Sequence, residues 1–421
     1  MANTLNLGTD GNWGVKKDSL LGYNSENGNF KPLPFDFTRA SSATVVNKAG
    51  LIETVGSGEP RIDFLGNTKG ALKLEPQRTN LITYSEAFDN AYWTKSGASV
   101  VSDAAISPDG SLNAFKLVES ATNAVHRINS PFAGITTATP HTFKVYAKAG
   151  ESSKIGFREN ASTANYATFD LSLGTVLDSD GLTTSIKEVS NNWYEISYTF
   201  TSGSSEIMAI YVLSDSYTTG SPELAYLGDG SSGLYIYGAQ LEQGSYATSY
   251  IPTQGSAVTR LADVCSQTVP DGIIGQTEGV LFFDGYYGDE VSEIYLFTQS
   301  STGTGVSDSM YLQKSGASSL KFIGRDASAT TQWDITGGSF SIGQKIKVAA
   351  AYKNNDVVLY INGLQIGADL VALIPTMSNV KIGGYPSQPS VSNYFLSKPV
   401  NDVKLYNTRL SNSELQQLTT I

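Results

Sequence analysis

Short runs in which large apolar residues alternate with polar residues occur along most of this chain. The alternation is clearest at residues 141–148, 193–200 and 234–237. Successive side chains of a β-strand point to opposite faces, so a period of two predicts strands that bury one face. Gly, Asn, Asp and Ser separate these runs, as expected for turns. The pattern therefore predicts an all-β protein.

The predicted strands form two series that meet within residues 234–263. Pro252 has no backbone N–H to donate to a ladder, so strand pairing should end close to it. About nine short strands precede this point, which is enough for a two-sheet sandwich, and a second series follows it. We therefore predict two tandem jelly-roll β-sandwiches, one over residues 76–262 and one over residues 263–421.

Two local signals are strong in the second sandwich. Asn362 and Gly363 lie between two apolar runs, and both residue types tolerate the positive φ angles of a type I′ hairpin turn. Further along, Ser411 is followed three residues later by Glu414, which is the spacing of a helix-starting capping box. These signals predict a tight hairpin and a short C-terminal helix whose leucines pack inward.

Residues 1–75 form the least regular part of the sequence, with many glycines and few apolar runs. The runs at 43–46 and 51–55 flank a turn and predict one hairpin. A segment with so few core-forming residues buries little surface by itself. We therefore predict an irregular anchoring and oligomerisation segment that gains order from other copies, from the next domain or from a docking protein.

Arg39 and Arg61 are the notable cations of this segment. Arginine is the preferred residue for buried and interfacial ion pairs. We therefore expect each of the two to pair with an Asp or a Glu.

Charge and cysteine content exclude several functions. The net charge is −11 and the sequence pI is about 4.8, whereas nucleic-acid surfaces and anionic membranes both attract basic segments. No apolar run approaches the roughly 20 residues of a membrane span, and the first residues do not resemble a secretory signal. Cys265 is the single cysteine, so no intrachain disulfide can form and folding does not require an oxidising compartment.

Three motifs stand in the first two-thirds of the chain. They are Phe37-Thr-Arg-Ala-Ser-Ser-Ala-Thr with Gly50-Leu-Ile-Glu, then Leu74-Glu-Pro-Gln-Arg-Thr-Asn, and finally Tyr237-Gly-Ala-Gln-Leu-Glu with Tyr250-Ile-Pro-Thr and Thr259-Arg-Leu-Ala-Asp. Together they resemble the phage head spike fibre, or virion fibre, proteins of tailed bacteriophages, in which the third motif ends a carbohydrate-binding-like jelly roll. The last part of the chain contains Leu359-Tyr-Ile-Asn-Gly, Ile382-Gly-Gly and Val403-Lys-Leu-Tyr-Asn, and it resembles concanavalin A-like and laminin G-like jelly rolls.

The resemblance implies a structural protein of a bacteriophage virion, either a head-fibre or a tail-appendage subunit, that adheres to host-surface glycans. The implied partners are other virion proteins of the capsid, neck or tail, further copies of the chain in a homotrimer, and a host-cell glycan. The protein would assemble in the host cytoplasm and reside in the virion. No nucleic acid and no membrane is expected as a partner.

A polysaccharide-degrading tail enzyme is the main alternative, because some phage appendages cleave surface polysaccharide. Glycoside hydrolysis needs two carboxylates across one bond, and the Glu-x-Asp-x-x-Glu run of jelly-roll glucanases is missing from this sequence. Glu290 and Glu293 would point to opposite faces of a strand. His126 and His141 lie in no recognisable catalytic motif and are expected at the surface or half-buried. We predict no enzymatic activity; a decorative protein without a ligand is a further alternative.

Sugar recognition places aromatic rings beside polar donors. The candidates for carbohydrate-binding residues are Trp93, Tyr286, Tyr287 and Trp333. An alternating aromatic residue on a strand is also typical of a sandwich core, which is the alternative here. Calcium is the one cofactor under consideration, because carboxylates in loops supply the oxygens that it prefers. Its candidate ligands, which could equally be solvated loop acids, are Asp109, Asp229, Glu242, Asp284, Asp289 and Asp402.

Overall fold

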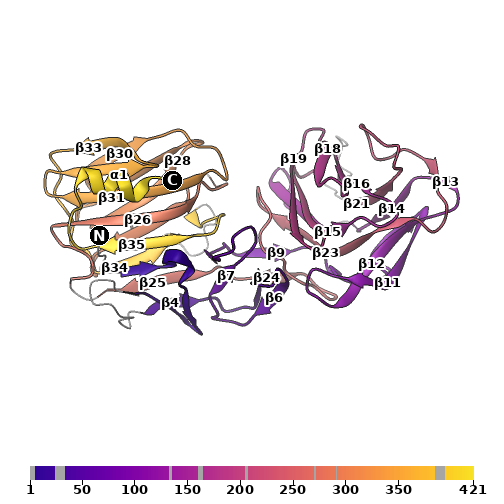
Figure 1. The fold of residues 1–421 in the computed structure, drawn as a ribbon, viewed down its shortest axis with the longest axis horizontal. Coiled ribbons are helices and arrows are strands. Elements are labelled where there is room, and N and C mark those ends of the chain that lie inside the picture. The colour runs from indigo at the N-terminus through magenta and orange to yellow at the C-terminus, as the bar shows by residue number, and fades with distance from the viewer. Residues whose placement is uncertain are drawn as a thin grey trace. The chain divides into compact units, whose positions relative to one another are not determined.

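The computed structural model describes residues 5–23, 34–131, 135–159, 165–203, 207–269, 272–290, 292–384 and 394–421. These residues form antiparallel sheets, one 3-10 turn, η1 (Thr9–Gly11), and one short α-helix, so the all-β prediction is confirmed. The chain divides into two compact units (Figure 1). Unit 2 comprises Ala43–Thr54 and Arg78–Arg260, and unit 1 comprises Met1–Ser42, Val55–Gln77 and Leu261–Ile421.

Unit 2 is a sandwich of two six-stranded antiparallel sheets. The order in its first sheet is β10 (Thr94–Ser96), β14 (His126–Asn129), β21 (Met208–Leu213), β16 (Lys154–Glu159), β17 (Tyr166–Asp170) and β18 (Thr175–Asp178). The order in its second sheet is β11 (Ala98–Ile106), β12 (Leu112–Glu119), β23 (Gly233–Gln243), β15 (Pro140–Lys148), β20 (Trp193–Thr201) and β19 (Thr183–Ser190). Three short pairs complete the unit: β5 (Ala43–Val46) with β6 (Ile52–Val55), β9 (Arg78–Asn80) with β24 (Val258–Arg260), and β13 (Asn123–Ala124) with β22 (Tyr226–Leu227).

The core of unit 2 lies between its two sheets. On β15, Phe143, Val145 and Ala147 enter this core, and the period of two then places Lys144 and Tyr146 on the opposite face. The predicted hairpin at 43–55 is confirmed as the pair β5 and β6.

A β-bulge interrupts the pairing of β23 with β15 at Gly238, where φ is +65°. The extra residue changes which side chains face the core. Beyond the bulge, Ala239 and Leu241 are core residues. Gln240 and Glu242 therefore share the outer face of this sheet with Tyr237, before the bulge.

Unit 1 is also a two-sheet sandwich. The order in its six-stranded sheet is β1 (Leu5–Leu7), β35 (Asp402–Tyr406), β26 (Glu278–Tyr286), β31 (Lys345–Lys353), β32 (Val357–Ile361) and β33 (Leu364–Asp369). The order in its nine-stranded sheet is β2 (Gly14–Lys16), β3 (Ser19–Leu21), β4 (Pro34–Thr38), β25 (Val264–Thr268), β34 (Asn379–Ile382), β27 (Ile294–Gln299), β28 (Ser309–Ser315), β29 (Ser319–Arg325) and β30 (Thr331–Gly337). A separate pair joins β7 (Arg61–Asp63) to β8 (Ala71–Lys73).

The segment at residues 1–75 was expected to be irregular, but its described residues contribute strands to these units. Leu5 of β1 pairs with Leu405 of β35, and Phe37 of β4 pairs with Cys265 of β25. Leu5, Phe35 and Phe37 are fully buried in the core of unit 1. The physical reason is that each short apolar run completes a sheet whose other strands come from the C-terminal half, so the segment needs no core of its own.

The two local signals of the second sandwich are both confirmed. Asn362 and Gly363 have φ angles of +50° and +81° and join β32 to β33. The helix α1 (Asn412–Thr419) begins with a capping box between Ser411 and Glu414. Figure 1 shows α1 beside β31, where the buried Leu415 packs on the outer face of the six-stranded sheet. In the described part of the chain, no helix has the length and apolar character needed to cross a membrane.

Candidate functional site

Three of the four predicted sugar platforms are core residues. Trp93 is 1% exposed and packs against Phe88, with ring centroids 5.0 Å apart. Tyr287 and Trp333 are 0% and 2% exposed. A buried ring presents no face to a sugar, so the interpretation of these three as platforms is wrong for this structure. The prediction failed because alternation identifies the two faces of a strand but does not say which face is buried. The fourth candidate, Tyr286, keeps a partly exposed side chain.

Each of the six predicted calcium ligands already pairs with a donor group of the protein. Asp284 lies opposite Asp402 across β26 and β35, but Lys345 and Lys404 lie 3.7 and 2.9 Å from these two carboxylates. Lys398 lies 2.6 Å from Asp289. The other three accept hydrogen bonds from neighbouring side chains or backbone, as follows: Asp109 from Tyr237, Asp229 from Ser232, and Glu242 from Thr248. Across the described residues, no group of three or more His, Cys, Asp or Glu is arranged to hold a metal ion.

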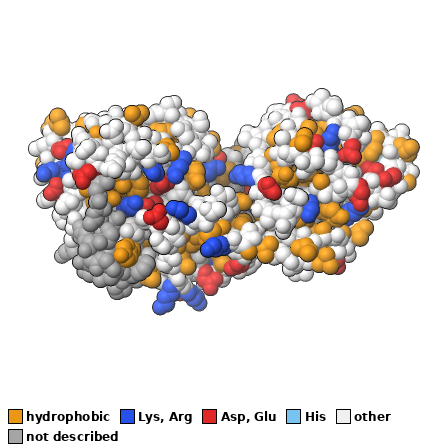
Figure 2. Space-filling view, viewed as in Figure 1, with side chains coloured by type: hydrophobic (Ala, Val, Ile, Leu, Met, Phe, Trp, Pro, Cys, Tyr) orange, Lys and Arg blue, Asp and Glu red, His pale blue; other side chains and the backbone are white. Residues whose placement is uncertain are grey.

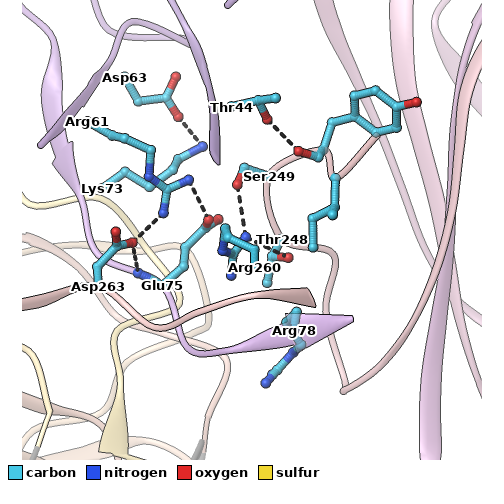
Figure 3. Close-up of polar contacts among 12 residues, drawn as sticks. Thr44, Arg61, Asp63, Lys73, Glu75, Arg78, Thr248, Ser249, Arg260 and Asp263 are labelled. Atoms are coloured by element: carbon cyan, nitrogen blue, oxygen red, sulfur yellow. Dashed lines mark hydrogen bonds and ion pairs between the residues drawn. The ribbon is translucent and has the colours of Figure 1, made fainter. Parts of the chain in front are cut away.

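In unit 1, the motif residues Arg39, Glu75 and Asp263 meet Arg61 in a buried ion cluster. Figure 3 labels Arg61, Glu75 and Asp263 of this cluster. Asp263 accepts from Arg39 Nη1 at 2.9 Å through Oδ1, and from Arg61 Nη2 through Oδ2. The second guanidinium nitrogen of Arg61 lies 2.8 Å from Glu75 Oε2. Burial lowers the pKa of Arg61, but the charges of Asp263 and Glu75 outweigh this and raise it above its ordinary value. The expected pairing of both arginines with acids is therefore confirmed.

In unit 2, motif residues form a second buried polar cluster. Glu242 Oε1 accepts from the backbone N–H of Thr248 at 2.7 Å, and Glu242 Oε2 accepts from the hydroxyl of Thr248 at 2.7 Å. Arg260 Nη1 donates to Thr248 Oγ1 at 3.2 Å and to Ser249 Oγ at 2.9 Å (Figure 3). Arg78 lies over the ring of Tyr246 at 5.4 Å. These contacts hold the segment after β23 against the outer face of its own sheet.

Both clusters are buried and internally paired, so their chemistry is structural. Arg39, Arg61 and Arg260 are each at most 2% exposed. A charge that is buried and paired in this way costs several kcal/mol when its partner is removed. The motifs that carry the sequence resemblance therefore position backbone segments; they do not form a ligand surface.

A different polar group lies on the outer face of the first sheet of unit 2. Arg127 of β14 and Arg158 of β16 flank β21 and both form ion pairs with the carboxylate of Glu223. Tyr211 of β21 accepts from Arg127 Nη1 at 3.1 Å and lies 3.2 Å from Glu223 Oε1. The arginine side chains are 29% and 18% exposed. Sequence reasoning missed this group, because Glu223 lies in a separate loop and only tertiary structure brings it to the sheet.

Burial opposes the charge of Glu223, but the hydrogen bonds and charges of Arg158 and Arg127 outweigh it and hold the pKa of this carboxyl below its usual range. The group is therefore ionised at neutral pH. In the cluster of Arg127, Arg158 and Glu223, two partly exposed cations thus share one carboxylate.

Glu290 and Glu293 lie in the loop between β26 and β27 and are 9% and 0% exposed. Glu293 Oε1 accepts from the backbone N–H groups of Glu290 and Ser397 at 3.2 and 3.1 Å. Glu293 Oε2 is buried without a hydrogen-bond partner among the described residues. Burial raises the pKa of Glu293 to about 7. The two carboxylates are thus enclosed by protein and are not on opposite faces of one strand, as the sequence had suggested.

The prediction for the two histidines is also corrected. His126 and His141 are each 1% exposed. His126 Nε2 lies 3.1 Å from the carbonyl oxygen of Tyr226 and its ring lies edge-on to the tyrosine ring. His141 lies against Phe200. Both imidazoles fill space beside an aromatic ring, which alternation alone could not indicate.

Charged side chains are dispersed over the face of the molecule that Figure 2 draws. On the face drawn in Figure 2, Lys and Arg side chains lie among Asp and Glu side chains, with polar and hydrophobic surface between them. This agrees with the charged fraction of 16%.

No family model matches this chain, and no curated protein matches it. Among solved structures, the CBM40 module of the Ruminococcus gnavus IT-sialidase, bound to alpha2,3 sialyllactose, is 18% identical with a TM-score of 0.30, over 35% of this chain and 84% of that chain. Domains LG4-5 of the mouse laminin alpha1 chain are 12% identical with a TM-score of 0.26, over 70% and 88%. Trypanosoma rangeli sialidase in complex with sialic acid is 11% identical with a TM-score of 0.31, over 73% and 60%.

Proposed function

We propose that this chain is a structural protein of a bacteriophage virion, a head-fibre or tail-appendage subunit whose sandwich domains adhere to host-surface glycans. The observation that carries the proposal is the convergence of the motif residues in two buried polar clusters. Residues that must fit one another in three dimensions constrain each other. The resemblance includes Arg39, Glu75 and Asp263 of the first cluster and Glu242 and Arg260 of the second. It therefore supports a shared architecture with the phage head spike fibre proteins.

The proposal places the chain in the virion, bound to capsid, neck or tail proteins. Electron microscopy of virions from a host that produces them, with gold-labelled antibodies raised against this chain, tests the location. Label on the head or on the tail supports the proposal and distinguishes the two positions. Purified virions that contain none of the chain would overturn it.

A homotrimer is the assembly that the resemblance favours. Size-exclusion chromatography with light scattering should give three times the chain mass of 44.9 kDa. A stable monomer at micromolar concentration would contradict a trimeric fibre and leave a monomeric decoration.

Glycan adhesion is tested by applying the full chain to an array of host-surface polysaccharides, with calcium and with a chelator. Binding supports adhesion, and loss of binding in chelator supports the predicted use of calcium. Absence of binding in both conditions favours the decorative alternative. Release of reducing ends from the same polysaccharides would instead favour a depolymerase.

A further inference from the structure

A loop of unit 2, residues 214–227, lies along the outer face of the first sheet and is called the strap. Lys154 of β16 donates to the strap carbonyls of Asp215 and Tyr217 at 2.7 and 2.6 Å. Asp178 of β18 accepts from the backbone N–H of Gly220 at 2.9 Å. The strap is therefore tied to the strands at several points.

The strap makes close contact with β16. A Cβ built on Gly156 of β16 would lie 2.7 Å from Pro222 Cβ, closer than side chains pack. Glycine at position 156 therefore lets the strap approach the sheet. This approach brings Glu223, which follows Pro222 in the strap, between Arg127 and Arg158. The carboxylate of Glu223 thus reaches both guanidinium groups from the strap and not from the sheet.

The group on the sheet has the chemistry of a carboxylate receptor. Two guanidinium groups and the hydroxyl of Tyr211 converge on one planar carboxylate, and arginine recognises that shape better than any other side chain does. Among the described residues, the Nε atoms of Arg127 and Arg158 have no hydrogen-bond partner, and neither has Oδ1 of the adjacent Asn129. Buried polar atoms are normally paired, so this face has spare donors and a spare acceptor beside its carboxylate.

The charges lead to the same conclusion. Two cations share one anion, so the group keeps a net positive charge on a chain whose net charge is −11. The side chain of Glu223 is 35% exposed, so solvent reaches its carboxylate.

We propose that Arg127, Arg158 and Tyr211 bind the carboxylate of an acidic sugar, and that Glu223 occupies this site in the unliganded chain and is displaced by the ligand. This inference rests on the proposed glycan adhesion and specifies its substrate class. The internal occupant indicates the chemistry: a site shaped for the planar carboxylate of Glu223 accepts a uronic or sialic acid and rejects the same sugar without its charge.

The test uses the full chain and isothermal titration with glucuronic acid, with its methyl ester as the uncharged ligand of the same ring. Wild type should bind the acid and not the ester. Glu223→Gln removes the competing charge, and we expect it to bind the acid about tenfold more tightly, which corresponds to about 1.4 kcal/mol. Arg158→Gln should abolish binding, and circular dichroism shows whether that variant is folded.

Asp178→Asn is the matched control, because it removes the contacts that hold the strap at Thr219 and Gly220 and leaves the arginines paired with Glu223. It should leave the affinity for glucuronic acid within about twofold of wild type. If Asp178→Asn tightens binding as much as Glu223→Gln does, strap mobility and not carboxylate exchange sets the affinity, and the inference is wrong. Equal binding of the acid and the ester would overturn the inference and leave the proposed glycan adhesion standing. A chain that binds neither of these ligands but binds neutral glycans on the array would have the same consequence.

Discussion

At the scale of single residues, the most unusual group is the carboxyl of Glu293. This carboxyl is fully buried, and burial is the main cause that raises its pKa from 4.5 to about 7. The charge of Asp289 also raises this pKa, whereas hydrogen bonds from Ser397 and Glu290 lower it. The charge of Lys314 also lowers the pKa of Glu293, and Lys398 is paired with Asp289. The protonated form is thus the one that the fold favours.

The folded pKa of Glu293 lies above its unfolded value, so its contribution to stability is complete below about pH 4.5 and is lost as the pH rises through 7. Between pH 5 and pH 8, unit 1 should lose up to about 3 kcal/mol of unfolding free energy that Glu293→Gln would retain. Urea denaturation at several pH values measures this difference. Parallel pH profiles for wild type and variant would show that the carboxyl is not protonated in the folded chain.

Asp263 is the acid on which two buried arginines depend. Asp263→Asn should lower the unfolding free energy by about 3–5 kcal/mol, because Arg39 and Arg61 would keep buried charges without their shared carboxylate. Asp10→Asn is the control: Asp10 pairs with Lys69 at the surface, and such pairs contribute about 0–1 kcal/mol. Denaturation curves of the two variants should therefore differ strongly, and equal losses would contradict a structural role for the cluster.

At the scale of elements, β1, β3 and β4 contribute buried residues to the core of unit 1, whereas β2 does not. Leu5 of β1 is 1% exposed, whereas Val15 of β2 is 48% exposed. Leu5→Ala should cost about 2–5 kcal/mol, and Val15→Ala should stay within about 0.5 kcal/mol of wild type. Scanning calorimetry of both variants tests whether β1 is an integral strand of unit 1. If the segment became ordered only on binding a partner, neither substitution would shift the thermal unfolding transition.

These elements also explain which parts of the structure sequence reasoning could reach. The turn at Asn362-Gly363 and the capping box at Ser411 were predicted correctly, because neighbouring residues determine both. The pairing of Leu5 with Leu405 could not be predicted, because nothing near either residue indicates its partner. The site formed with Glu223 was missed for the same reason: its arginines and its carboxylate come from three separate segments. Arg39 and Arg61 could be assigned to ion pairs but not to the same acid.

At the scale of the whole molecule, the single cysteine reports on the opening of unit 1. Cys265 is fully buried on β25, and burial raises the pKa of its thiol above its ordinary value, with Asp263 and Asp36 raising it further. The native chain should therefore react slowly with a thiol reagent at pH 8, and one equivalent should react rapidly in denaturant. Rapid reaction of the native chain would mean that β25 leaves its sheet readily.

The pairing of β1 with β35 has a consequence for how the protein is made. Unit 2 is nearly continuous in sequence and can close while the rest of the chain is still being translated. Leu5 must wait for Leu405, about 400 residues later, which at about 5–20 residues per second is roughly 20–80 s. During that interval the apolar strand β1 has left the ribosome without its partner β35, so this strand of the nascent chain is exposed to proteases and to aggregation.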